Sequence, residues 1–140
     1  MKANAPYYIY RIANCLHKWH IPIIPFVFQQ LLRFIFCCFI PYQTKIGKNA
    51  HFSHLGMGVV LHKACVIGNN AIIDQQVTIG GRTDDKLPVI GDNVRIGAGA
   101  KVLGGVHIGN NAKVGANAVV LIDVPDGATA VGVPARIVQK

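Results

Sequence analysis

The chain contains few charged residues and no long apolar run. Of its 140 residues, 14% are charged and 51% are hydrophobic. This balance excludes a disordered chain and allows a dense core within one domain. The most apolar segment, residues 26–39, is interrupted by Gln29, Gln30 and Arg33. It is shorter than the roughly 20 apolar residues of a membrane-spanning helix, so none is predicted.

Cysteine patterns and secretion signals are also missing. The four cysteines lack the spacing of a metal site and indicate no disulfide framework; they are Cys15, Cys37, Cys38 and Cys65. The first fifteen residues include Pro6, Arg11 and Asn14 in place of the apolar core of a cleavable signal peptide. We therefore expect reduced cysteines and a cytoplasmic protein.

Acidic residues are scarce. The chain has 6 acidic and 14 basic residues, which give a net charge of +8. This charge is compatible with ordinary solubility, with binding of a polyanionic small ligand, or with contact to an anionic membrane surface. The basic residues are scattered and form no recognised nucleic-acid motif. No nucleic-acid partner is predicted.

A repeat of six residues runs from Ile90 to Val124. Each block opens with an aliphatic residue and places a small or β-branched residue four positions later. The opening residues are Ile90, Ile96, Val102, Ile108, Val114 and Val120. This period fits neither a helix nor a half-buried strand, and it is typical of a parallel β-helix whose three faces close a coil of about eighteen residues. Gly, Asn and Asp near the corners tolerate tight turns and positive φ angles.

Two segments of different character are predicted. Residues 1–42 form an N-terminal helical segment, and residues 43–140 form the β-helix with a C-terminal cap. Within the first segment, one helix follows Pro6 and a second covers residues 26–39, while Pro41 ends the helical region and Ile46 opens the solenoid. Two positions remain open for the second helix. It packs on the base of the β-helix or on a neighbouring subunit, or it lies on a membrane surface, with the contact made through residues 21–42.

The repeat is interrupted twice. After Phe52 its phase shifts by three residues and is expected to resume at Leu55, and this interruption contains His54. The second interruption, GGRTDDKLPV, lies between Ile79 and Ile90. Insertions project from a solenoid without disturbing its core, so both segments are predicted to contribute to function.

The run VTIGG, followed after the loop by residues 90–138, resembles serine acetyltransferases of the hexapeptide-repeat superfamily. The resemblance covers about residues 43–138 and is closest to the short forms associated with polysaccharide biosynthesis. It implies a left-handed β-helix, acetyl-CoA as the donor and a small-molecule hydroxyl as the acceptor. It also implies a homotrimer with active sites between neighbouring subunits.

The same resemblance gives a catalytic role to His54. The family's catalytic histidine matches His54 once one residue is inserted after it, and His62 is the second choice. An imidazole can take the proton of a weakly nucleophilic hydroxyl as that hydroxyl attacks the thioester. Because CoA thiolate is a good leaving group, no covalent enzyme intermediate and no metal are expected.

Contacts to CoA are also expected from the resemblance. Small residues that allow the pantetheine arm to approach the backbone are expected at Gly81, Ala98 and Ala116. Candidate partners of the CoA phosphates are Lys101, Lys113 and Arg136.

Three positions depart from the family pattern. Ser53 stands where the family has an aspartate before its catalytic histidine. Leu87, in Asp85-Lys86-Leu87-Pro88, stands where the family has a second active-site histidine. The family aspartate that precedes the first repeats has no match in residues 41–43. The acceptor is therefore left as L-serine or a sugar hydroxyl of a polysaccharide precursor.

Two other functions are compatible with the predicted fold. One is a non-catalytic trimeric scaffold that presents the N-terminal helices. The other is a zinc hydratase of the γ-carbonic-anhydrase type, which needs three histidines around the metal and an open fourth position. His51, His54 and His62 are candidates, but they lack the expected pair of histidines about five residues apart.

Overall fold

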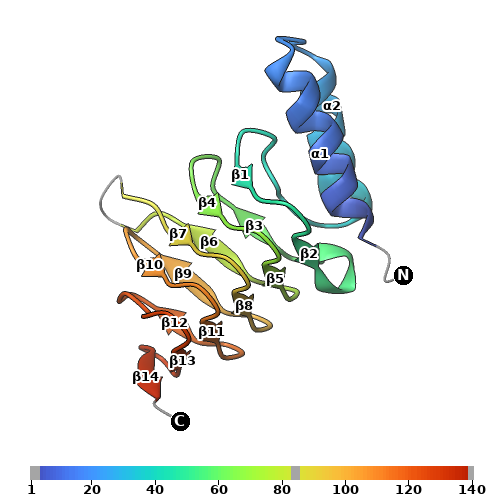
Figure 1. Ribbon diagram of the computed structural model, residues 1–140. Coiled ribbons are helices and arrows are strands. Elements are labelled where there is room, and N and C mark those ends of the chain that lie inside the picture. Colours follow the sequence, from blue (N-terminus) through green and yellow to red (C-terminus); the bar gives the residue numbers. More distant parts are fainter. Residues whose placement is uncertain (1–3, 83–85, 139–140) are drawn as a thin grey trace.

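The computed structural model describes residues 4–82 and 86–138 (Figure 1). A hairpin of two helices, α1 (Ala5–Lys18) and α2 (Ile24–Ile35), stands at the N-terminal end of a solenoid of short strands. The strands are β1 (Lys45–Ile46), β2 (His51–Phe52), β3 (Val60–Leu61), β4 (Val66–Ile67), β5 (Ile72–Ile73), β6 (Thr78–Gly80), β7 (Val89–Ile90), β8 (Arg95–Ile96), β9 (Lys101–Leu103), β10 (His107–Ile108), β11 (Lys113–Val114), β12 (Val119–Val120), β13 (Thr129–Val131) and β14 (Arg136–Val138).

The strands form three sheets, one on each face of a triangular prism. The orders are β1-β4-β7-β10, β2-β5-β8-β11-β13 and β3-β6-β9-β12, with parallel pairing throughout. β14 pairs with β13 in the antiparallel direction. Equivalent residues of successive coils lie in register, as Ile46 does with Ile67 and Ile67 with Ile90. The predicted left-handed β-helix is confirmed.

The core consists of the two positions that the repeat specifies. The aliphatic residues that open each block point inward and are buried, including Ile67, Ile73, Ile90 and Ile96. The residue four positions later is also buried, and it is alanine at Ala71, Ala100, Ala112 and Ala118. Successive coils stack at about the 4.8 Å spacing of paired strands, which leaves room for only a small side chain at the corner.

One corner of the prism carries an asparagine ladder. Asn49, Asn70, Asn93 and Asn111 have φ angles of 56°, 54°, 56° and 58°. The side-chain amides of the first three donate to the side-chain oxygen of the asparagine in the next coil, at 3.3, 3.0 and 3.3 Å. Asparagine tolerates the left-handed conformation better than most residues, which explains its recurrence here. The predicted use of asparagine at tight corners is confirmed.

The second helix and the start of the solenoid differ from the prediction. α2 ends at Ile35, whereas the helix was expected to continue to Phe39. Cys37 has a φ of 51°, which breaks the helix, and the Phe39 amide then donates to the Val59 carbonyl at 2.8 Å. The first inward position of the solenoid is Ile40, 1% exposed, and not Ile46. Backbone pairing with the next coil therefore outweighs the helical pattern of this segment.

The first helix caps the first coil. The hydroxyl of Tyr7 donates to the Gly47 carbonyl at 3.0 Å, and the hydroxyl of Tyr10 donates to the Thr44 carbonyl. Both rings are buried, so α1 packs on the base of the β-helix. Neither helix in the described ranges has the length and apolar composition needed to cross a bilayer.

Candidate functional site

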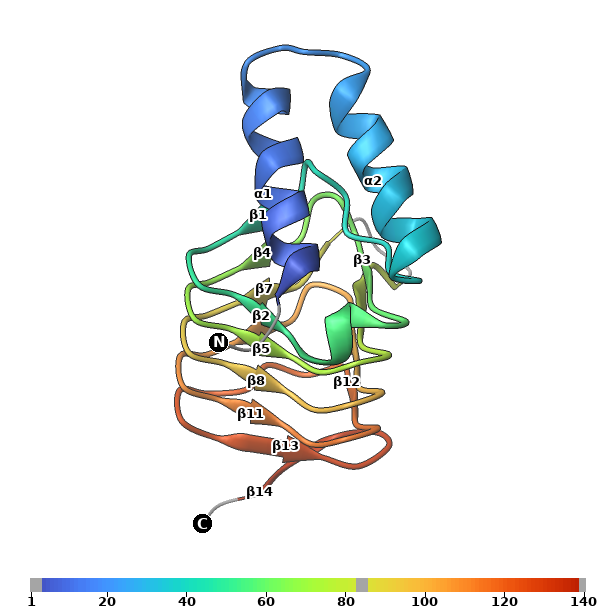
Figure 2. The same ribbon diagram turned by 90° about the vertical axis from the view of Figure 1, so that its right-hand side faces the viewer.

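The first interruption of the repeat forms a short 3-10 turn at one edge of the prism, between β2 and β3 (Figure 2). His54 and Leu55 adopt φ angles of 51° and 56°. Leu55 is 39% exposed, so the expectation that the repeat resumes there is wrong. The inward position passes from Phe52 to Leu61, because the three inserted residues leave the coil and carry His54 outward with them.

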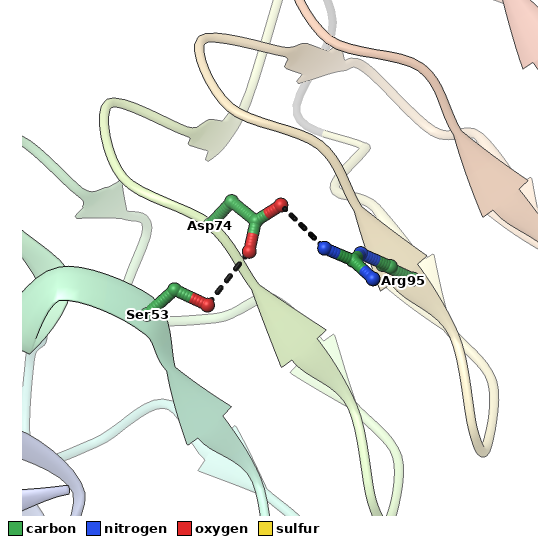
Figure 3. Close-up of polar contacts among 3 residues, drawn as sticks. All are labelled: Ser53, Asp74 and Arg95. Atoms are coloured by element: carbon green, nitrogen blue, oxygen red, sulfur yellow. Dashed lines mark hydrogen bonds and ion pairs between the residues drawn. The ribbon is translucent and has the colours of Figure 1, made fainter. Parts of the chain in front are cut away.

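A chain of polar contacts lies directly beside this turn (Figure 3). The Ser53 hydroxyl donates to Asp74 Oδ1 at 2.7 Å, and Arg95 Nη2 lies 3.5 Å from Asp74 Oδ2. The three residues come from successive coils of one sheet, because β2, β5 and β8 pair in register. The Asp74 carboxylate is thus held between a hydroxyl and a guanidinium.

These side chains line an open pocket of about 600 Å³. Its walls are His51, Ser53, His54, Leu55, Asp74, Gln75, Arg95 and Ala98. The pocket brings the exposed His54 together with Ala98, two residues singled out from the sequence. A histidine, a carboxylate and a guanidinium around one polar space can accept a proton, stabilise the resulting charge and bind a polar substrate.

Asp74 and Arg95 were missed by the sequence reasoning. Asp74 lies one coil after Ser53 in the structure. In the sequence, the two residues are separated by one coil plus the three inserted residues, which hides the relationship. A count of eighteen residues per coil, corrected for the insertion, is the signal that finds Asp74.

His62 lies in a different place from His54. It lines a second, more apolar pocket of about 500 Å³ together with Tyr42, Gly80 and residues of α2. Its Nδ1 accepts a hydrogen bond from the Ala64 amide at 3.2 Å. Among residues 4–82 and 86–138, no three His, Cys, Asp or Glu side chains form a group that could hold a metal ion.

Two of the residues expected to contact CoA share the edge that carries His54. Ala98 follows β8 and Ala116 follows β11, and the Asn117 amide donates to the Ala98 carbonyl at 2.8 Å. The coils are so close here that a Cβ on Gly97 would lie 2.7 Å from the Ala116 nitrogen. The neighbouring coil therefore leaves no room for a side chain at Gly97, next to Ala98.

The remaining CoA candidates are spread over the prism. Lys101 Nζ donates to the Gln76 carbonyl at 2.8 Å, and Lys113 lies in register with Arg95 on the outer face of the same sheet as His51. Gly81 follows β6 at another edge, and Arg136 lies in β14 at the C-terminal end.

Part of the second interruption lies outside the described residues. Asp85, the first residue of the motif compared with the family's second active-site histidine, belongs to that part. Lys86 is exposed and Leu87 is half-buried where the chain returns to β7.

Two family models match the chain. The model of the bacterial transferase hexapeptide, with six repeats, matches residues 88–121. The model of the hexapeptide repeat of succinyl-transferase matches residues 43–75. The two matches together cover most of the solenoid and leave out the interruption between Ile79 and Pro88.

Curated relatives are named serine acetyltransferases. One from Synechococcus elongatus is 37% identical over 134 residues, which make up 94% of this chain and 54% of the relative. One from Helicobacter pylori is 43% identical over 134 residues, 94% of this chain and 78% of the relative. The chain thus spans between about half and three quarters of the length of these relatives.

Solved structures of serine acetyltransferases are also similar to this chain. A soybean serine acetyltransferase complexed with serine is 43% identical with a TM-score of 0.88, covering 95% of this chain and 56% of the other. A serine acetyltransferase in complex with CoA is 41% identical with a TM-score of 0.87, covering 95% and 55%. Agreement in both repeat and structure over nearly the whole chain shows that it belongs to the serine acetyltransferase family of hexapeptide-repeat proteins.

Proposed function

We propose that this protein transfers an acetyl group from acetyl-CoA to the hydroxyl of a small molecule, with His54 as the general base. The observation that carries the proposal is the position of His54. The residue stands on an insertion, exposed, in a polar pocket at the edge of the prism that also bears Ala98 and Ala116. Membership of the family supports acetyl-CoA as the donor.

The reaction needs one proton acceptor and one leaving group. The His54 imidazole takes the proton of the acceptor hydroxyl as its oxygen attacks the thioester carbonyl. The carbonyl carbon then expels the CoA sulfur, the C–S bond breaks, and the imidazolium returns the proton to the thiolate. The products are the acetyl ester and free CoA.

Asp74 is proposed as the carboxylate that supports this step. The family aspartate is replaced by Ser53, whose hydroxyl donates instead to Asp74 from the next coil. Asp74 lines the same pocket as His54, so its negative charge stabilises the positive charge that forms on the imidazole. Arg95, held by Asp74, is placed to contact the acceptor or the developing oxyanion.

We propose a homotrimer with active sites between subunits. The edge with Ala98 and Ala116 supplies one wall for the pantetheine arm of CoA. Gly81, at a different edge of the prism, lines the facing wall from a neighbouring subunit. Lys101, Lys113 and Arg136 are the proposed partners of the CoA phosphates, since they are basic and reach the solvent.

L-serine is the first acceptor to test, because the relatives carry the name serine acetyltransferase and one was solved with serine. A sugar hydroxyl is the second candidate. The observation that favours it is Leu87, an apolar side chain at the position of a family histidine, which offers no group for a carboxylate.

The test measures CoA release from acetyl-CoA with L-serine and with a panel of sugars. His54→Ala should lower kcat/KM by about 10²- to 10⁴-fold, the usual contribution of a general base. His62→Ala is the matched control, since it removes an exposed histidine from the other pocket. If His62→Ala shows the large loss and His54→Ala does not, the assignment of the base is wrong. If wild type and His54→Ala are equally inert on every acceptor and CoA does not bind, the protein is a scaffold.

A further inference from the structure

The helical hairpin exposes two apolar stripes. On α1, Tyr8, Ile12 and Trp19 are exposed at helical spacing. On α2 and the residue before it, the exposed apolar side chains are Ile23, Ile24, Phe26, Val27, Leu31, Phe34 and Ile35. The buried residues of α2, Pro25 and Leu32, lie on its opposite side. A surface helix normally turns a polar face outward, so this arrangement is the reverse of the usual one.

Two strongly exposed apolar side chains lie at the free end of the hairpin. The turn between α1 and α2 projects beyond the solenoid and is the part of the hairpin farthest from it (Figures 1 and 2). Trp19 and Ile23, each 71% exposed, flank this turn. Trp19 is the single tryptophan of the chain. Tryptophan favours the boundary between water and hydrocarbon, where its ring is buried and its N–H can still donate.

The charge of the hairpin has one sign. Arg11, Lys18 and Arg33 are exposed on the two helices. Asp74 is the first acidic residue of the sequence, so neither helix contains a negative side chain. A second copy of the hairpin would therefore place cations against cations with no acidic side chain to pair them. An anionic surface with an apolar layer behind it matches both the charge and the stripes.

We propose that the hairpin binds the surface of an anionic lipid bilayer. Trp19 and Ile23 enter the interfacial layer, and the apolar stripes of α1 and α2 follow them to the depth of the acyl-chain boundary. Arg11, Lys18 and Arg33 contact the lipid phosphates, because basic side chains are attracted to a negatively charged membrane surface. The solenoid and its His54 pocket then stand above the membrane and face an acceptor held there or in the adjacent solution.

The single tryptophan makes the proposal directly measurable. The full chain is titrated with vesicles of equimolar phosphatidylglycerol and phosphatidylcholine, and with vesicles of phosphatidylcholine alone, while Trp19 emission is recorded. Binding to the anionic vesicles should shift the emission to shorter wavelength, and high salt should weaken it because the charges are exposed. No shift and no co-sedimentation with the anionic vesicles would overturn the proposal. Equal binding to both kinds of vesicle would show that the cations play no part and would refute it in this form.

Three variants separate lipid binding from folding and from self-association. Ile23→Asn and Lys18→Gln should each weaken co-sedimentation severalfold, and together by about tenfold or more. Val133→Asn is the matched control, since Val133 is equally exposed but lies at the opposite end of the solenoid. All variants should keep the far-ultraviolet circular dichroism and the mass of wild type. A drop in oligomer mass in Ile23→Asn would show that the stripe binds another copy of the chain, and the proposal would fall. Because lipid binding is measured without substrate, its failure leaves the acetyl-transfer proposal untouched.

Discussion

At the scale of single residues, the proposed site contains one carboxylate, that of Asp74, beside the proposed base His54. The family position before the catalytic histidine is Ser53, and the negative charge comes from Asp74 in the next coil. The pairing of Asp74 with both Ser53 and Arg95 holds that charge beside the pocket of His54. We propose that Asp74, one coil away, supplies the charge that Ser53 lacks.

Asp74→Asn tests this role. The amide can still contact the Ser53 hydroxyl, but the substitution removes the negative charge. We expect kcat to fall about tenfold and KM for acetyl-CoA to stay unchanged, because the carboxylate is proposed to act on the imidazolium that forms in the transition state and not on bound CoA. Steady-state kinetics measure the two constants separately. Asp74→Glu should restore part of kcat, since it restores the charge. Loss of thermal stability in Asp74→Asn with kcat unaltered would mean that Asp74 has a structural role only.

At the scale of elements, the corners decide how the strands stack. The Asn93 side chain is hydrogen-bonded to the coil before it and to the coil after it, and its backbone has a φ of 56°. Both properties contribute to stability, and they can be separated by substitution.

Asn93→Ala should lower the free energy of unfolding by about 1–2 kcal/mol, because an ordinary side chain is strained in the left-handed region. Asn93→Gly removes the same ladder bonds but adopts this φ freely, so it should cost less. Urea unfolding of both variants measures the difference. If both variants lowered the free energy of unfolding equally, the destabilisation would come from the lost ladder hydrogen bonds and not from backbone strain.

Tyr10 links α1 to the first coil and predicts a dependence on pH. Burial raises the pKa of its hydroxyl to about 12, from an ordinary value near 10. The folded state therefore favours the neutral hydroxyl. Its contribution to the free energy of unfolding is fully present below about pH 10 and is lost as the pH rises through 12. Burial likewise raises the pKa of the Cys38 thiol to about 12 and of the Cys65 thiol to about 11, which acts in the same direction.

Tyr10→Phe should lower the free energy of unfolding by about 1–3 kcal/mol at neutral pH, since the buried Thr44 loses a partner for its carbonyl. Above pH 10 the difference from wild type should shrink. Urea unfolding at several pH values measures it, with Tyr8→Phe as the control because Tyr8 is exposed. A difference that stays constant up to pH 11 would contradict the role given to the Tyr10 hydroxyl.

At the scale of the whole molecule, the proposed site is completed by neighbouring subunits. Light scattering after size exclusion should give three times the 15.1 kDa of one chain. Dilution that dissociates the trimer should lower the activity per chain, because one wall of the CoA groove is then lost. A monomeric mass with full activity would contradict an active site between subunits.

The sequence was sufficient to predict the solenoid because each coil repeats the same two inward positions. It also located the interruption that carries His54, which forms the turn between β2 and β3, since a break is visible against a regular repeat. It failed where long-range pairing decides the outcome. The pairing of Phe39 with the next coil ends α2 early, and the contact of Ser53 with Asp74 depends on how many residues leave the coil. Leu55 was misplaced for the same reason, because periodicity alone does not show which residues loop out.

The cap that α1 places on the first coil has a consequence for solubility. An open solenoid end presents unpaired backbone groups that can template another strand, and stacked ends can grow into fibrils. Here side chains of the first helix occupy those groups: Asn4 binds the Ala50 carbonyl and the Phe52 amide, and Asn14 binds the Tyr42 carbonyl. At the other end, β14 folds back antiparallel on β13 and covers the last strand. The molecule thus closes both ends of a structure that could otherwise extend without limit.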